Sequence, residues 1–143
     1  MSASTLRLIL AGVLFVHGIG HFLGIMAALQ LGTANVEGWT SDLSLLTGIV
    51  NNKISRALCF VLFFAALLLS VSAGMALMGW LIPHEWWRLL AIVSAAISSL
   101  TLILFWNAFP SLIPNKLGAL IVDIAIFVLL IWQRWPTETA IGY

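Results

Sequence analysis

Long apolar runs alternate with short polar connections along the chain. Four runs of roughly membrane-spanning length cover residues 8–31, 57–82, 89–109 and 117–132. A helix needs about 20 mostly apolar residues to cross a bilayer, and a charged side chain costs about 2.5 to 3.5 kcal/mol at its centre. Apart from Asp123, the charged residues lie between the runs or at their ends. The pattern therefore predicts four transmembrane helices.

The connections between these runs predict how the helices are arranged. The two connections that follow the second and third runs are short, which makes neighbouring helices antiparallel. Only the connection 32–55 is long. It is either a plain loop or, because Leu43, Leu46 and Val50 have helical spacing, a short helix in the membrane interface. We expect an all-α, up-down-up-down transmembrane four-helix bundle that forms a single domain over residues 1–143.

The composition supports a membrane protein and excludes two other classes. Apolar residues make up 62% of the chain and charged residues only 8%, whereas soluble domains carry about 25% charge. Soluble core helices are therefore a poor alternative, because nothing would be left to face water. The net charge of +1 provides no basic surface for nucleic acid. The expected surroundings are a lipid bilayer and other membrane protein subunits.

Location and orientation follow less directly. The first run is longer than the apolar segment of a secretory signal peptide, so we expect it to remain as a spanning helix. Four spans place both termini on one side of the membrane. The six Lys and Arg residues divide equally between the two sides, so the positive-inside rule gives no answer. We expect a multi-pass protein of the bacterial cytoplasmic membrane with cytoplasmic termini.

Ionisable residues inside the predicted spans are the candidate functional residues, because they are costly in a bilayer and normally face a partner or a cavity. They are His17 and His21 in the first span and Asp123 in the fourth. At a rise of about 1.5 Å per residue, His17 and Asp123 lie roughly 15 to 17 Å from the side of the termini. The same count places Ser70 and Ser98 in this layer.

The spacing of these residues predicts their contacts. His17 and His21 are four residues apart and share one helix face. Gly20 and Gly24 form a small-xxx-small pair, which predicts close helix packing. An unpaired carboxylate at the depth of Asp123 would be unfavourable, so we expect His17 to form a hydrogen bond or an ion pair with Asp123.

Two interpretations of this polar layer stay open. The layer either forms interhelical hydrogen bonds that fix helix register or is a site for a ligand, a proton or a cofactor. Two histidines and a carboxylate are more than register requires. Ser70 and Ser98 are more simply explained by hydrogen bonds to the carbonyl one turn back. We predict no metal site and no catalytic residue, because no nucleophile, metal triad or phosphate loop is present.

The first span resembles the first helix of DoxX-like four-helix membrane proteins. The resemblance rests on Arg7-Leu8-x-Leu10-x-Gly12-x-x-Phe15-x-His17-Gly18-x-x-His21-Phe22-x-Gly24. The loop Leu46-Thr47-Gly48, the entry Trp86-Trp87-Arg88 and the closing Gly118-x-x-x-x-Asp123 are similar to small bacterial relatives of that group. The resemblance implies a four-helix bundle associated with membrane oxidoreductase or quinone-linked systems. It implies no catalytic residue.

Three functions remain in competition. The chain is an accessory subunit of a larger membrane redox or energy-converting complex, or a component that binds quinone or a tetrapyrrole through His17 or His21. The third possibility is a self-contained membrane enzyme or proton-coupled transporter that uses His17 and Asp123 as an acid–base pair. We rank this one last, because four helices enclose little room for substrate. Two histidines four apart on one helix also cannot bind opposite faces of one haem.

Overall fold

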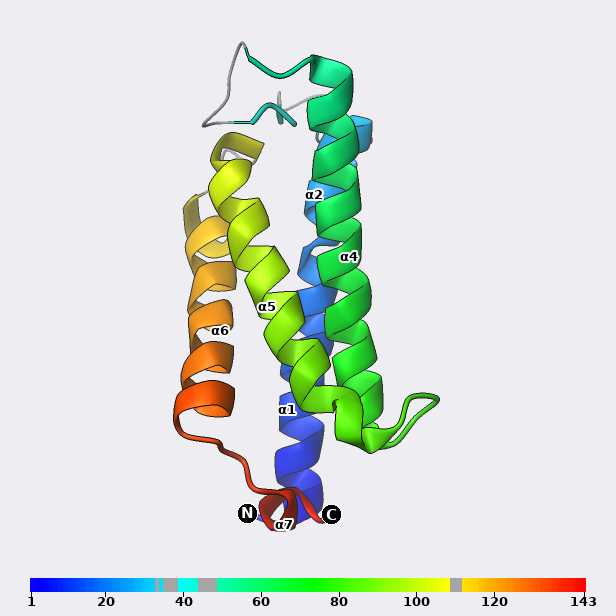
Figure 1. Cartoon of the computed structure of the whole chain (residues 1–143), viewed down its shortest axis with the longest axis vertical. Helices are drawn as coiled ribbons and strands as arrows, with labels where there is room; N and C mark the ends of the chain where they lie inside the picture. Colours follow the sequence, from blue (N-terminus) through cyan, green and yellow to red (C-terminus); the bar gives the residue numbers. More distant parts are fainter. Residues whose placement is uncertain (33, 35–38, 44–48, 109–111) are drawn as a thin grey trace.

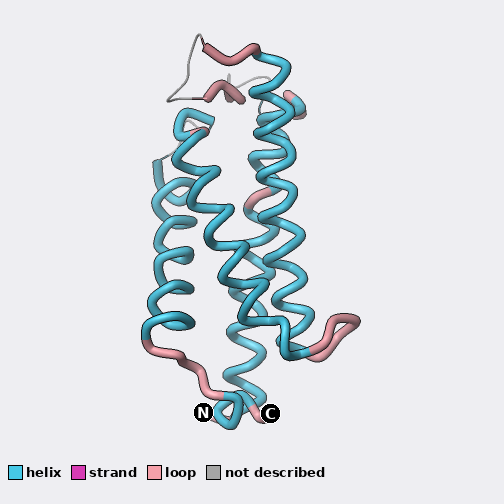
Figure 2. The backbone as a smooth tube through the Cα atoms, viewed as in Figure 1, coloured by secondary structure: helices cyan, strands magenta, loops and turns pink. Residues whose placement is uncertain are grey.

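The computed structural model describes residues 1–32, 34, 39–43, 49–108 and 112–143. Over these residues the protein is all-helical, without strands, as Figure 2 shows. The prediction of an all-α chain is confirmed. The α-helices are α1 (Ala3–Gly20), α2 (Phe22–Leu29), α4 (Asn52–Met78), α5 (Trp87–Leu104), α6 (Leu117–Phe127) and α7 (Glu138–Ile141). The 3₁₀ turns are η1 (His84–Trp86) and η2 (Trp106–Ala108), and the π-type segments are η3 (Leu112–Lys116) and η4 (Val128–Trp132).

Three helical segments are long and apolar enough to cross a membrane, namely Ala3–Leu29, Asn52–Met78 and His84–Leu104. The fourth apolar segment, Leu117–Trp132, is shorter. Large apolar side chains such as Val16 and Ile121 are exposed on the outer faces of these segments. Such faces are compatible with a lipid bilayer.

The first two segments begin earlier than the apolar runs because polar residues cap them. The Ser2 side chain accepts a hydrogen bond from the backbone N–H of Thr5, so α1 begins at Ala3. The Asn51 side chain likewise accepts from the N–H of Lys53, so α4 begins at Asn52. Capping supplies partners for helix-end N–H groups irrespective of hydropathy. The two helices therefore extend beyond the predicted apolar runs, which begin at residues 8 and 57.

The first predicted helix is interrupted at His21. The N–H of His21 bonds to the carbonyl of Gly18 at 3.0 Å, and the N–H of Gly24 bonds to the carbonyl of His21 at 3.0 Å. Both hydrogen bonds join residues that are three apart in sequence, as in a 3₁₀-helix, which is wound more tightly than an α-helix. Gly18, Gly20 and Gly24 surround the break, and glycine weakens a helix by roughly 1 kcal/mol relative to alanine. The tightened turn separates α1 from α2.

The long helices lie side by side: α4 contacts α1, α2 and α5, and α5 crosses in front of α1 in the view of Figure 1. Helix α6 packs against α5. Both termini lie at the same end, where α7 packs against α1 (Figure 1). One buried cluster near α2 includes Phe63 and Phe105, and a second near the termini includes Leu77 and Ile141.

Close helix contacts occur at Gly18 and at Gly24, one member of the predicted pair, but not at Gly20, the other member. A Cβ at Gly18 would lie 3.0 Å from the Cβ of Ser70, and one at Gly24 would lie 2.2 Å from the Cγ of Phe63. A Cβ at Gly20 would have no described atom within 4 Å. The prediction of a Gly20 packing contact was wrong, because this face of α1 turns away from α4. The predicted interfacial helix in the long connection includes Leu46, which lies outside the described residues.

Candidate functional site

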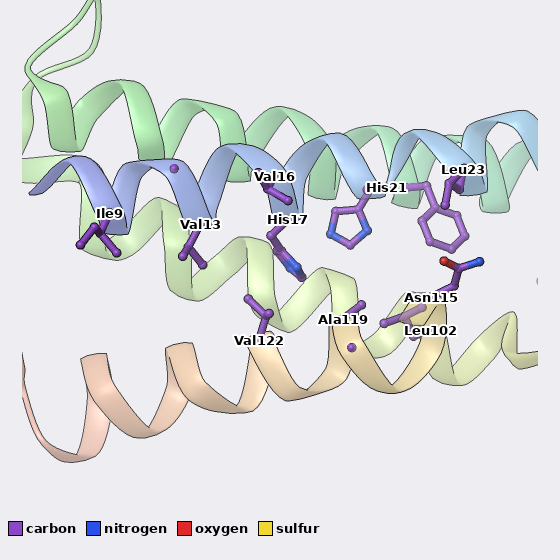
Figure 3. A pocket seen from close by; sticks show the side chains of 14 residues that line it. Ile9, Val13, Val16, His17, His21, Leu23, Leu102, Asn115, Ala119 and Val122 are labelled. Atoms are coloured by element: carbon purple, nitrogen blue, oxygen red, sulfur yellow. The ribbon is translucent and has the colours of Figure 1, made fainter. Parts of the chain in front are cut away.

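A cavity of about 700 Å³ lies between α1 and α6. The side chains around it include His17, His21, Asn115, Ala119 and Val122 (Figure 3). Gly12, Gly20 and Gly118 also line it. A Cβ at Gly12 or Gly20 would meet open space, so the lack of side chains there leaves the space between the two helices unfilled. The size is in the usual range for small-molecule sites, about 300 to 1,000 Å³.

Asp123 anchors the polar side of this region from the middle of α6. Its side chain is completely buried. The Oγ of Ser98 donates a hydrogen bond of 2.6 Å to Oδ2, and the Oγ of Ser99 donates one of 3.2 Å to the same oxygen. Both serines belong to α5. Two hydroxyl donors partly replace the water that a buried carboxylate has lost.

His17 approaches the other oxygen of Asp123. Its Nε2 lies 2.9 Å from Oδ1, the contact that the helix depths predicted. This distance is within the range of an ion pair. The contact between Nε2 and Oδ1 does not have the geometry of a hydrogen bond, because the ring N–H is not aligned with the oxygen.

His21 is the second histidine on the cavity wall, and it has no such partner. Its residue is 3% exposed, and its Nε2 has no hydrogen-bond partner among the described residues. The ring packs edge-on against that of His17, with 4.7 Å between centroids, and lies 6.0 Å from that of Phe63. In Figure 3 it points toward the space between α1 and α6. An unsatisfied buried polar group costs about 1 to 3 kcal/mol, so a ligand that supplies a partner would be stabilised here.

The remaining predicted residues divide between the site and the packing. Ser98 joins Asp123, so the expectation that it bonds within its own helix was wrong. Ser70 is not part of the site: its Oγ donates a 2.8 Å hydrogen bond to the carbonyl of Leu14 on α1. It therefore ties α4 to α1 and does not use the carbonyl one turn back. Gly24 receives the ring of Phe63 and acts in packing.

Sequence reasoning missed Ser99 and Asn115. Ser99 adjoins Ser98, and the Ser-Ser pair was a visible signal. Asn115 falls in the predicted connection before the fourth run, outside the predicted polar layer. In the structure its amide lines the cavity (Figure 3). Within the described residues, no group of three His, Cys, Asp or Glu side chains is placed to hold a metal ion.

Comparisons with known proteins assign neither a family nor a function to this chain. No protein-family model, curated protein or solved structure matches this chain. The resemblance to DoxX-like proteins therefore stays a prediction. The arrangement itself offers an apolar cavity, a His21 Nε2 without a partner among the described residues, an amide and a close His17–Asp123 contact.

Proposed function

We propose that the chain is a DoxX-like transmembrane four-helix bundle with up-down-up-down topology and a single domain. Three segments of spanning length and the shorter apolar segment Leu117–Trp132 support this proposal. The position of both termini at one end supports an even number of spans (Figure 1). A membrane location, with the termini on the cytoplasmic side of a bacterial membrane, belongs to the same proposal.

The bundle binds a membrane-soluble cofactor with a hydrogen-bonding head group, and a quinone is the class that fits best. The observation that carries this proposal concerns His21, which lines a 700 Å³ apolar cavity and whose buried Nε2 has no hydrogen-bond partner among the described residues. A quinone ring is flat and apolar, and its carbonyl oxygens accept hydrogen bonds. The Nε2–H tautomer of His21 would donate to one carbonyl, and the amide of Asn115 is available to the other.

The residues of the chain would orient the ring and manage a proton. A quinone supplies two-electron redox chemistry, and its reduction consumes two protons. The His17–Asp123 pair lies beside the cavity, with 2.9 Å between Nε2 and Oδ1. Ser98 and Ser99 fix the carboxyl group through Oδ2, so that Oδ1 stays available to His17. In this proposal the pair would pass protons to the head group one at a time and would be reprotonated from the aqueous side of the membrane, so that two transfers complete the reduction.

Electrons would come from a larger membrane redox complex of which this chain is an accessory subunit. In the part of the chain that the structure describes, no group of three His, Cys, Asp or Glu side chains is placed to hold a metal ion. A tetrapyrrole is the second candidate ligand, because the free Nε2 of His21 would provide one axial ligand. The alternative of a self-contained enzyme or proton-coupled transporter would use the same His17–Asp123 pair.

The test is purification from the native membrane in lipid nanodiscs, with an absorption spectrum and mass spectrometry of the bound lipids and proteins. We expect a quinone at fixed stoichiometry in the wild type and its loss in His21→Leu. His84→Leu is the matched control, because His84 does not line the cavity. A Soret band would replace quinone by a tetrapyrrole. A protein that carries neither cofactor and travels with no redox subunit would contradict the proposal.

A further inference from the structure

A second cavity continues the first along the seam between α1 and α6. Its volume is about 160 Å³. Val13 and Val122 line both cavities. From there the second cavity extends past Ala125 and Leu129 to Trp135, beyond the end of η4. The two cavities therefore form one seam that runs from Asn115 toward the end of the molecule that holds the termini.

The polarity of this seam changes from one end to the other. The side chains that can hydrogen-bond to a head group, those of His17, His21 and Asn115, all line the first cavity. The second is lined by aliphatic and aromatic residues, among which Trp87 and Trp135 carry the polar groups, one indole N–H each. Apolar cavities of this kind do not hold water and take apolar ligands instead. A molecule that fills both cavities must be polar at one end and hydrocarbon at the other.

The seam also fits one chain better than two. The second cavity has less than a quarter of the volume of the first, so it accepts a narrower group than the ring site does. Ile121 and Ala125 line it and are exposed on the outer face. A hydrocarbon chain can therefore enter sideways from the surrounding lipid.

We infer that the second cavity binds the hydrocarbon tail of the ligand whose head group occupies the first cavity. The ligand is a single-chain lipid with a hydrogen-bond-accepting ring, and its tail lies against α6 from Val122 to Leu129. This inference rests on the proposed function, since it requires a ring bound near His21. It adds that the chain length of the ligand determines its affinity.

The test compares two probes with the same dimethoxy-methyl-benzoquinone ring, one with a decyl chain and one without a chain. Binding to the purified protein in nanodiscs is measured by titration calorimetry, with empty nanodiscs subtracted. Affinity is expressed as mole fraction in the lipid, so that the greater partitioning of the decyl probe is removed. We expect the decyl probe to bind at least about 5-fold more tightly.

A substitution that fills the second cavity should remove this difference. In Ala125→Leu we expect both probes to bind alike, with the affinity of the chainless probe within about 2-fold of wild type. Ile121→Phe serves the same purpose if Ala125→Leu does not fold. The control is Ile124→Phe, which enlarges an exposed residue that lines neither cavity and should preserve the full difference.

The outcomes separate the two proposals. Equal mole-fraction affinities of the two probes for the wild type, or a full chain-length effect in Ala125→Leu, would overturn the tail site and leave the ring site standing. Failure of both probes to bind the wild type, with no difference between the wild type and His21→Leu, would overturn the proposed function together with the tail site. Loss of the chain-length effect in Ala125→Leu, with the effect preserved in Ile124→Phe, would support both the ring site and the tail site.

Discussion

The ring of Phe63 fills the place where a side chain on Gly24 would project. A Cβ at Gly24 would lie 2.2 Å from Cγ of Phe63 and 2.3 Å from Cδ2. Phe63 is 1% exposed and lies in the cluster that joins α2, α4 and α5. Gly24 thus allows α2 to approach α4 closely enough to enclose an aromatic ring, and the same ring borders the cavity beside His21.

Gly24→Ala should therefore destabilise the protein. The methyl group would displace a fully packed ring, and such overpacking costs about 1 to 3 kcal/mol. The measurement is thermal unfolding of the purified protein in detergent, followed by helical circular dichroism. Gly20→Ala is the matched control on the same segment: its methyl group enters open space, so we expect unchanged or slightly greater stability. Equal stability of the two variants would contradict the packing argument.

The contact between His17 and Asp123 predicts energetic coupling. Removing one partner leaves the other buried and without compensation, so His17→Leu and Asp123→Asn should each lower stability by about 1 to 3 kcal/mol. The double variant should lose less than the sum of the single losses, with a coupling energy of about 0.5 kcal/mol or more. A double-mutant cycle of unfolding in mixed micelles measures it. Strictly additive losses would show that the 2.9 Å contact contributes nothing.

The two serines that bond to Asp123 should differ in their contributions. The bond from Ser98 is 2.6 Å and fully buried, whereas that from Ser99 is 3.2 Å and partly buried. We expect Ser98→Ala to cost about 1 to 3 kcal/mol, as for a hydrogen bond to a charged or strongly polar buried group, and Ser99→Ala to cost less. The same unfolding assay ranks them. A larger loss for Ser99→Ala would contradict the geometry.

Glu138 lies outside the spanning segments and links the C-terminal helix α7 to η1 and to the start of α5. Its Oε2 lies 2.8 Å from Nε2 of His84, and its Oε1 accepts a 3.1 Å hydrogen bond from Nε of Arg88. Partial burial acts to raise the pKa of Glu138, but the hydrogen bonds and charges of His84 and Arg88 outweigh it and lower the pKa below its ordinary value of 4.5.

The lowered pKa of Glu138 fixes the sign of a pH effect. A carboxyl group with a lower pKa in the folded state adds stability above its unfolded pKa, and this stability is lost as pH falls through the folded pKa. Glu138→Gln should therefore lower the melting temperature at pH 7, and the difference from wild type should shrink below about pH 4.5. Glu85→Gln is the matched control. A difference independent of pH would contradict the proposed role of the charge.

Hydropathy and charge placement alone predicted the helical class, the three long apolar segments and the presence of His17 and His21 within the first of them. These follow from local composition, because a bilayer requires about 20 apolar residues per span and makes every intramembrane charge conspicuous. Equal depth was also enough to pair His17 with Asp123, since helices of similar length start from the same membrane surface.

The tertiary structure decided everything that depends on helix rotation and separation. The estimated depth of Ser70 predicted that it lies in the same layer as Asp123. The rotation of α4 about its axis instead directs the Ser70 hydroxyl to the carbonyl of Leu14. Spacing paired Gly20 with Gly24, but the tightened turn at His21 leaves Gly18 against α4 and Gly20 facing the cavity. Periodicity records which residues share a face, not which neighbour that face meets, and only the packed helices create the seam between α1 and α6.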